Sequence, residues 1–295
     1  MNSYTSDRID LLNRLITPSD KVVEIGPGYT PICDKSDYDL CIYVDALTKE
    51  ELELRSLTTP FADIEKAATQ HRVDVIFDNS LIKSIESSSY SKEIGDFDCI
   101  AASHVIEHIP NHIGFFKDAE QMLKPGGVIV GANPIPEMCF DCFRPYTTIG
   151  DLIDRYHNDM NAPDLKSIID TQFYQHHLDG RGMWEKSDLK TSTPLPVYTD
   201  VENVVKNIYE STLQRLTDGE YIDVHTLVAS PDWFALLMFD LYLSGYSKYT
   251  VETMIILENE YFFRLKDQTE YAKNLGGIDY FKSKRDQLYR KIAGI

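Results

Sequence analysis

Short apolar runs alternate with amphipathic stretches through the first half of the 295-residue chain. The runs predicted as buried strands occupy residues 22–25, 40–47, 73–79, 98–102 and 128–132. Helical spacing marks residues 48–71, with a break at Pro60, and residues 113–123, which a Lys-Pro-Gly-Gly turn ends. Because strands that alternate with helices build parallel sheets, the pattern predicts an α/β fold with a doubly wound sheet.

The last third of the chain adds an antiparallel element to this pattern. Residues 221–230 are expected to rejoin the sheet, and residues 231–245 predict a helix that begins after Ser230 and stops at a glycine. Residues 251–257 and 261–265 are predicted as two strands joined by the short segment Glu-Asn-Glu, which suits a hairpin. The final strand is therefore expected to run antiparallel to its neighbour.

Three further segments lie outside the sheet pattern. Residues 1–20 predict a short amphipathic helix with its leucines on one side. Residues 146–220 have helical periodicity interrupted by prolines and glycines, and we interpret them as an insertion that covers the active site. Residues 268–295 predict a charged amphipathic helix that packs on the domain or on a second subunit. The main domain is then expected to comprise residues 1–145 and 221–267.

Composition narrows the classes of function. Hydrophobic residues make up 43% of the chain and charged residues 26%, as in ordinary globular proteins, and no run of 18 apolar residues marks a membrane span. The N-terminus has no apolar core of the signal-peptide type, so a cytoplasmic location is expected. The net charge of −18 argues against nucleic acid as the main partner, because backbone binding needs clustered Lys and Arg. Five cysteines with one C-x-x-C do not support a four-thiolate zinc site and fit a reduced compartment.

A glycine turn follows the first predicted strand. Residues 26–28, Gly-Pro-Gly, let the backbone pass close to a ligand where a side chain would collide. Glu24 places a carboxylate inside the apolar strand, and burying an unpaired charge is costly. Asp45 ends the second strand roughly 20 residues later, where an acid accepts hydrogen bonds from ribose hydroxyls. A strand-ending Asp alone is an ordinary feature, but together with the turn it predicts a nucleoside site.

Four motifs in order resemble the class I S-adenosylmethionine-dependent methyltransferases over roughly residues 15–135. They are E-I-G-P-G, the strand-ending Asp45, D-x-I-x-A-S-H-V-I-E-H and L-K-P-G-G. The resemblance implies a Rossmann-like seven-stranded sheet with an antiparallel last strand, a mainly helical insertion, and S-adenosylmethionine as the cofactor. A nicotinamide site would instead need G-x-G-x-x-G, and Pro31 stands where its third glycine would be.

The resemblance also implies which residues contact the cofactor. These are Glu24, Gly26, Pro27 and Gly28 at the methionine part, Asp45 at the ribose, Asp78 and Asn79 at the adenine, and Ser103 beside the sulfonium. For Asp78, a solvated turn is an equally good alternative.

The run from His104 to His108 carries the predicted chemistry. The sulfonium already activates the methyl group, so the protein mainly aligns a hydroxyl nucleophile and removes its proton. His104 follows the fourth strand, and an imidazole with an unperturbed pKa near ~6.5 accepts a proton at neutral pH. We therefore predict His104 as the general base, with Glu107 and His108 as its orienting partners.

The spacing His104-x-x-Glu107-His108 also permits a divalent metal. On a helix these three side chains share one face, and His225 is a candidate fourth ligand or second base. Some O-methyltransferases of the resembled family hold a metal with E-x-x-E-H at this place, and here His104 replaces the first Glu. In the alternative, Glu107 and His108 only cap a short helix and pair with each other.

Candidate acceptor contacts come from two segments. Asp141 and Arg144 lie in an aromatic loop after the fifth strand, where an Arg can bind a hydroxyl, carboxylate or phosphate. An ion pair between the two that fixes the loop is the alternative. His176 and His177 belong to a polar and aromatic run in the insertion. The F-D-x-F-R-P stretch, residues 140–145, is similar to methyltransferases found among polysaccharide and glycan biosynthesis proteins.

The combined expectation is an O-methyltransferase that uses S-adenosylmethionine on a hydroxyl of a sugar or glycan. One alternative is a methyltransferase of a small molecule such as a phenol, a quinone or a natural product. Another is a non-catalytic, cofactor-binding partner within a glycan assembly complex. An enzyme of nucleic acid is disfavoured by the charge, and the sequence leaves open whether the chain forms a homo-oligomer.

Overall fold

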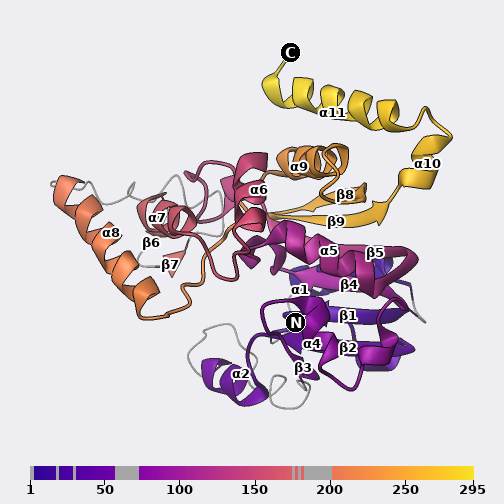
Figure 1. Cartoon of the computed structure of the whole chain (residues 1–295), viewed down its shortest axis with the longest axis horizontal. Coiled ribbons are helices and arrows are strands. Elements are labelled where there is room, and N and C mark those ends of the chain that lie inside the picture. Colours follow the sequence, from indigo (N-terminus) through magenta and orange to yellow (C-terminus); the bar gives the residue numbers. More distant parts are fainter. Residues whose placement is uncertain are drawn as a thin grey trace.

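The computed structural model describes residues 3–17, 20–28, 31–56, 73–174, 177–178, 181–182 and 201–295. Its centre is a seven-stranded sheet in the order β3-β2-β1-β4-β5-β9-β8 (Figure 1). The strands are β1 (Lys21–Ile25), β2 (Leu40–Asp45), β3 (Val75–Ile76), β4 (Phe97–Ser103), β5 (Leu123–Pro134), β8 (Tyr249–Leu257) and β9 (Glu260–Asp267). Strands β1 to β5 pair in parallel, whereas β9 is antiparallel to both β5 and β8. This arrangement confirms the predicted Rossmann-like sheet with an antiparallel last strand.

Helices cover both faces of the sheet. They are α1 (Ser3–Leu15), α2 (Lys49–Ser56), α4 (Leu81–Glu86), α5 (His112–Met122), α6 (Ile149–His157), α7 (Leu165–Tyr174), α8 (Val201–Thr217), α9 (Pro231–Leu243), α10 (Thr269–Lys273) and α11 (Ile278–Ala293). Successive strand residues point to opposite faces. Val23 and Ile42 share one core with α4, α5 and α9, and Val22 and Cys41 share the other with Leu12 of α1. Burial on both faces explains why the strands read as nearly continuous apolar runs.

Several predicted elements differ from the observed ones in extent. Strand β3 keeps only Val75–Ile76 of the predicted residues 73–79, and it lies at the sheet edge, where strands are commonly short. Strand β5 begins before the Lys-Pro-Gly-Gly run instead of after it. The predicted C-terminal helix is two helices, α10 and α11, because Gly276 and Gly277, at φ of 106° and 67°, break the helical path. Of the predicted helix over residues 48–71, α2 is observed, and residues 57–72 lie outside the described part.

Residues 221–230 do not join the sheet, and that prediction is wrong. No strand is assigned there. The backbone N–H groups of Thr226 and Leu227 instead donate to the carbonyl oxygen of Glu107, at 2.6 and 3.1 Å. Alternating apolar residues imitate a strand in this segment, but Ile222 and Val224 bury their side chains against helix α7. The segment is therefore an extended connection that ends beside the carboxyl end of β4.

Helices α6, α7 and α8 extend to one side of the sheet, and α11 lies over α9 on another side (Figure 1). All three helices of the first group begin within the predicted insertion, residues 146–220, of which residues 183–200 lie outside the description. A short antiparallel pair, β6 (His177–Leu178) with β7 (Arg181–Gly182), belongs to the same region. Across the described ranges, no helix is both long and apolar enough to cross a membrane.

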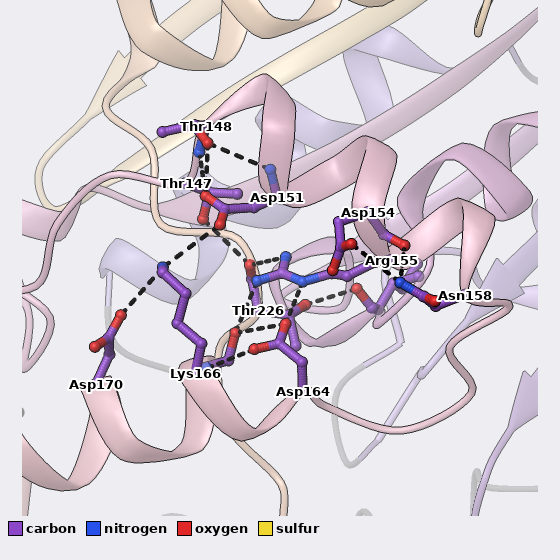
Figure 2. A network of polar contacts seen from close by, with 12 residues as sticks. Thr147, Thr148, Asp151, Asp154, Arg155, Asn158, Asp164, Lys166, Asp170 and Thr226 are labelled. Carbon is purple, nitrogen blue, oxygen red and sulfur yellow. Dashed lines mark hydrogen bonds and ion pairs between the residues drawn. The ribbon is translucent and has the colours of Figure 1, made fainter.

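A buried arginine joins α6, α7 and the 221–230 segment (Figure 2). Arg155 donates to the carbonyl oxygen of Thr226 at 2.6 Å and to Ser167 Oγ at 2.8 Å, and it also pairs with Asp164. Its side chain is 4% exposed. Because buried N–H groups need acceptors, this set of partners fixes where Arg155 can lie and holds the three elements together.

Arg155→Ala is expected to lower the free energy of unfolding by about 3 kcal/mol, because it removes the partner of several buried polar groups. The matched control is Lys166→Ala. Lys166 bridges Asp151 and Asp170 in the same network but is 56% exposed, so its loss is expected to cost less than about 1 kcal/mol. Urea denaturation followed by circular dichroism measures both values. Equal losses in the two variants would contradict the special role of Arg155.

Candidate active site

Two adjoining cavities open at the carboxyl ends of β1, β2 and β4. The larger has a volume of about 780 Å³ and the smaller a volume of about 370 Å³. Gly26 lines both of them, so they meet at the glycine turn that follows β1. Doubly wound sheets bind their ligands in the crevice at the carboxyl ends of the strands, and the cavities lie there.

The glycine turn has a conformation that other residues rarely adopt. Gly26 and Gly28 have φ of 60° and 52°. A Cβ atom on Gly26 would stand 2.6 Å from Cγ2 of Val105, so glycine lets the turn approach the residues after β4. The N–H of Gly26 donates to the carbonyl oxygen of Val44 at 2.8 Å, which ties the turn to β2.

Glu24 supports the loop behind this turn. Its carboxylate is buried and accepts the N–H groups of Ile32 and Cys33, at 2.7 and 2.9 Å. Burial raises the pKa of Glu24 to about 7, although these two hydrogen bonds oppose the rise. Glu24 also lines the smaller cavity. The carboxylate predicted to face the cofactor therefore has a structural role as well.

Asp45, Asp78 and Asn79 line the larger cavity together. Asp45 accepts the N–H of Leu47 at 3.0 Å, and Nδ2 of Asn79 donates to Oδ1 of Asp78 at 2.7 Å. Asn79 has φ of 58°, and positive φ in a residue other than glycine costs energy and clusters at functional sites. The structure thus brings to one cavity the residues that the resemblance assigns to the nucleoside.

His104 follows the last residue of β4, also with a positive φ, of 53°. Its Nδ1 lies 3.1 Å from Oε1 of Glu107, and its Nε2 contacts Oε1 of Glu260. Burial disfavours the charge on the imidazole, but the two carboxylates outweigh burial and raise the pKa of His104 to about 9. At neutral pH, His104 is therefore a cation between two anions, whereas the sequence predicts a neutral base.

Glu107, His108 and His225 form a cluster of metal-ligand type. One donor atom from each lies within 4.8 Å of the other two. The rings of His108 and His225 are nearly perpendicular, with centroids 4.7 Å apart. Glu107 is 1% exposed, and its buried Oε1 has His104 Nδ1 at 3.1 Å as its polar neighbour. Burial favours protonation of this carboxyl, but the neighbouring histidines outweigh burial and hold the pKa of Glu107 below its ordinary value.

A carboxylate orients each histidine of the cluster from the far side of its ring. Nδ1 of His108 binds Asp223 at 2.8 Å, and Nδ1 of His225 binds Asp141 at 2.5 Å. With Nδ1 engaged, Nε2 is the ring nitrogen that faces a ligand, an arrangement typical of metal-binding histidines. Burial lowers the pKa of His108, but Asp223 and Glu107 outweigh burial and raise it.

The observed arrangement corrects the predicted one. Helical conformation is limited to one 3₁₀ turn (Ile106–His108), and His104 precedes it. The three predicted ligands therefore do not share a helical face. His104 contacts Glu107 and Glu260, while His108 stands against His225. His225, the predicted fourth ligand, takes the third place in the cluster.

Asp141 and Arg144, predicted as acceptor contacts, are buried and line neither of the two cavities. Arg144 donates to Oδ1 of Asp141 at 2.8 Å and to the carbonyl oxygen of His225 at 2.9 Å. The pair holds His225 in place. An ion pair between Asp141 and Arg144 was the alternative that the sequence left open, and it is observed. Of the other two predicted contacts, His176 lies outside the described residues, and His177 is in β6 with its side chain outside the description.

Three residues near the site, Arg8, Asp223 and Glu260, were not identified by sequence reasoning. Arg8 of α1 lines the smaller cavity, and its Nε lies 2.9 Å from Oε2 of Glu260. The hairpin pattern predicts Glu260 as a turn residue, whereas it is the buried first residue of β9 beside His104. Contacts between residues this far apart in the chain leave no local pattern. The one signal in the sequence was the position of Glu260, an acidic residue at the start of an apolar strand.

Comparisons with known proteins add a family assignment. A family model described as a methyltransferase domain matches residues 3–137. Among solved structures, an S-adenosylmethionine-dependent methyltransferase from Mesorhizobium loti is similar, with 12% identity over 87% of this chain and 96% of that chain and a TM-score of 0.42. A putative S-adenosylmethionine-dependent methyltransferase from Listeria monocytogenes shows 10% identity over 91% of this chain and 100% of that chain, with a TM-score of 0.44.

A putative zinc-dependent alcohol dehydrogenase from Rhodobacter sphaeroides is similar to the same extent, with 10% identity, coverage of 88% and 89%, and a TM-score of 0.41. The likenesses to solved structures therefore do not distinguish activities. No curated protein matches the chain. The family model describes one activity, methyl transfer, whereas the solved structures are described as enzymes of different activities. Residues 3–137, a little under half of the chain, are therefore similar to a methyltransferase domain.

Proposed function

We propose that the protein transfers the methyl group of S-adenosylmethionine to a hydroxyl of a sugar or glycan. The observation that carries this proposal is the junction of the two cavities at Gly26, with His104 beside it. The adenosine part fits the larger cavity, where Asp45 accepts the ribose hydroxyls and the Asp78–Asn79 pair meets the adenine. The methionine part fits the smaller cavity, between the glycine turn and the end of β4.

His104 is proposed as the proton acceptor, once the cofactor is bound. In the empty site the carboxylates of Glu107 and Glu260 are balanced by the cations His104 and Arg8. The bound sulfonium disfavours the charge on the imidazole and so lowers its pKa. The hydroxyl oxygen then attacks the methyl carbon, the carbon–sulfur bond breaks to leave a neutral thioether, and His104 takes the hydroxyl proton. Because both ring nitrogens face carboxylates, the hydroxyl displaces one of them, and we propose Glu260, which Arg8 also binds.

The acceptor is proposed to occupy the part of the larger cavity that the insertion lines, next to the junction at Gly26. Tyr156, Met160 and Asn161, all within the proposed insertion of residues 146–220, line that cavity together with Tyr221. Aromatic faces combined with an amide suit a hydroxyl-bearing ring. A second candidate acceptor is a small phenol or quinone, which the apolar wall of Ile109 and Pro110 favours.

Glu107, His108 and His225 fit a divalent metal. The fit rests on the buried carboxylate of Glu107 and on two imidazoles whose Nδ1 atoms are held by carboxylates, with one donor atom of each residue within 4.8 Å of the other two. Two imidazoles and one carboxylate are ligands that Zn²⁺ and related transition metals accept. Such an ion, when bound, acts as a Lewis acid toward an acceptor oxygen. His108 lines the larger cavity, so the cluster reaches the acceptor side.

Radiolabelled S-adenosylmethionine offered with a panel of acceptors tests the function. Sugar nucleotides and oligosaccharides are expected to be labelled in preference to phenols and quinones. His104→Gln is expected to lower turnover about 100-fold or more, with the affinity for S-adenosylhomocysteine unchanged within a few-fold. Labelling of phenols alone would support the second candidate. Binding of S-adenosylhomocysteine without transfer to any acceptor would indicate a non-catalytic role, and either result would contradict the proposal.

The charge on His104 has a signature that needs no acceptor. In chelator-treated protein, an NMR titration of the His104 ring is expected to give a pKa of about 9. Since this exceeds the unfolded value near ~6.5, charged His104 stabilises the fold fully below about pH 6.5, and this contribution is lost as the pH rises through the folded pKa. Glu260→Gln removes one anion and is expected to lower the pKa. An ordinary pKa in the wild type, or no change in the variant, would contradict this electrostatic account.

Metal binding is expected to be visible without any activity assay. Chelator-treated protein should bind Co²⁺ stoichiometrically, with visible absorption bands from an N and O ligand set, and more tightly at higher pH because the histidines must release protons. Asp223→Asn should weaken binding about 10- to 100-fold by releasing His108, whereas the exposed Asp218→Asn should not. The metal proposal fails if the wild type takes up no Co²⁺, or if both variants bind it as the wild type does.

A further inference from the structure

The smaller cavity receives a cation from outside the sheet. Arg8 of α1 lines it, with a side chain that is 15% exposed. The other described residues of the lining are two acid–base groups, Glu24 and His104, and the neutral residues Gly26, Pro27, Gly28, Ile32 and Ser103. Among these, His104 and Arg8 are cations at neutral pH, and only Arg8 offers the planar fork of a guanidinium.

Helix α1 holds Arg8 in this position. Leu12, one turn further along α1, is fully buried in the core under that face of the sheet, and Ile16 just after the helix is buried with it. Residues i and i+4 of a helix lie on the same face, so Arg8 and Leu12 both face the sheet. The apolar anchor therefore directs the guanidinium to the carboxyl ends of the strands.

The present contacts of Arg8 leave part of its hydrogen-bonding capacity unused. Its Nε donates to both carboxylate oxygens of Glu260, at 2.9 and 3.1 Å, and its Nη2 donates to Oγ of Ser103. Within the described ranges, Nη1 donates to no acceptor. A guanidinium offers five N–H groups in a planar fork, and this fork matches the two oxygens of a carboxylate.

The methionine part of the cofactor carries an ammonium and a carboxylate. The acids around the smaller cavity, Glu24 and Glu260, suit the ammonium but repel the carboxylate. A carboxylate that leaves water for such surroundings needs a cation, and Arg8 is placed to supply it. We propose that Arg8 binds the cofactor α-carboxylate, so that α1 closes the methionine end of the site. This inference rests on the proposed cofactor position.

The same step changes the partner of Glu260. In the empty site Glu260 contacts both Arg8 and His104. When the α-carboxylate takes the fork of Arg8, Glu260 loses that cation and pairs with the incoming ammonium. Arg8 thereby serves as a residue that selects ligands with an intact carboxylate, and it should be indifferent to ligands that lack one.

Two ligands that differ only in the carboxylate test the inference by calorimetry. One is S-adenosylhomocysteine, and the other is its decarboxylated amine analogue, which keeps the ammonium. Arg8→Gln is expected to weaken S-adenosylhomocysteine about 10- to 100-fold and the amine by less than about 2-fold. Arg14→Gln, at an exposed position of the same helix, is the matched control and should change neither affinity.

The ratio of the two affinities separates a ligand contact from a structural role. Equal loss for both ligands in Arg8→Gln would mean that Arg8 only holds α1, and no loss for either would mean that Arg8 does not meet the carboxylate; both results overturn the inference. Wild-type protein that binds neither ligand would overturn the proposed function as well. Arg8→Lys should retain part of the discrimination, because it keeps the charge without the fork.

Discussion

The buried carboxylate of Glu107 is the constraint on which the rest of the site depends. An anion removed from water is costly unless cations and hydrogen bonds offset it, and His104, His108 and His225 surround this one. The backbone of Glu107 is engaged as well, because its carbonyl oxygen anchors residues 221–230. One residue therefore helps to raise the pKa of His104 and of His108, and it also attaches a distant segment to the end of β4.

That attachment explains why the failure of residues 221–230 to form a strand matters for function. As an eighth strand, the segment would carry its polar residues along the sheet edge. As an extended connection, it brings His225 against His108 and sets Asp223 behind the His108 ring. Arg155 and Arg144 hold the segment from the other side through its carbonyl oxygens. Buried arginines that line neither of the two described cavities thus define the geometry of the candidate metal cluster.

A feature of this site could be predicted from the sequence only where the residues that form it lie close together in the chain. The sheet and the two acids of the larger cavity follow from short patterns, since Gly26, Asp45 and Asp78 each stand at or just after the end of a strand. The hydrogen-bond partners of the histidines cannot be predicted from such patterns, because they depend on loops that meet only after folding. Nothing near His104 indicates that Glu260 will flank it, and that contact, together with Glu107, changes its expected charge at neutral pH. Motif spacing correctly placed Glu107 beside His104, but it also joined His108 to His104, whereas His108 stands against His225.

Asp141 shows a second limit of prediction from the sequence, which concerns the role of a residue and not its partners. Its loop is rich in aromatic and charged residues, which on composition suggests contact with an acceptor. Burial decides otherwise: at 2% exposure, Asp141 serves His225 and Arg144 instead of a ligand. Residue type alone cannot separate a side chain that binds a ligand from one that orients a neighbour, because both roles use the same chemistry.

A crystal structure with S-adenosylhomocysteine bound tests the central claim most directly. The account predicts adenosine in the larger cavity against Asp45, the homocysteine part in the smaller cavity, and the sulfur near Gly26 on the side of His104. A ligand bound outside these cavities, or one whose sulfur is directed away from His104, would contradict it.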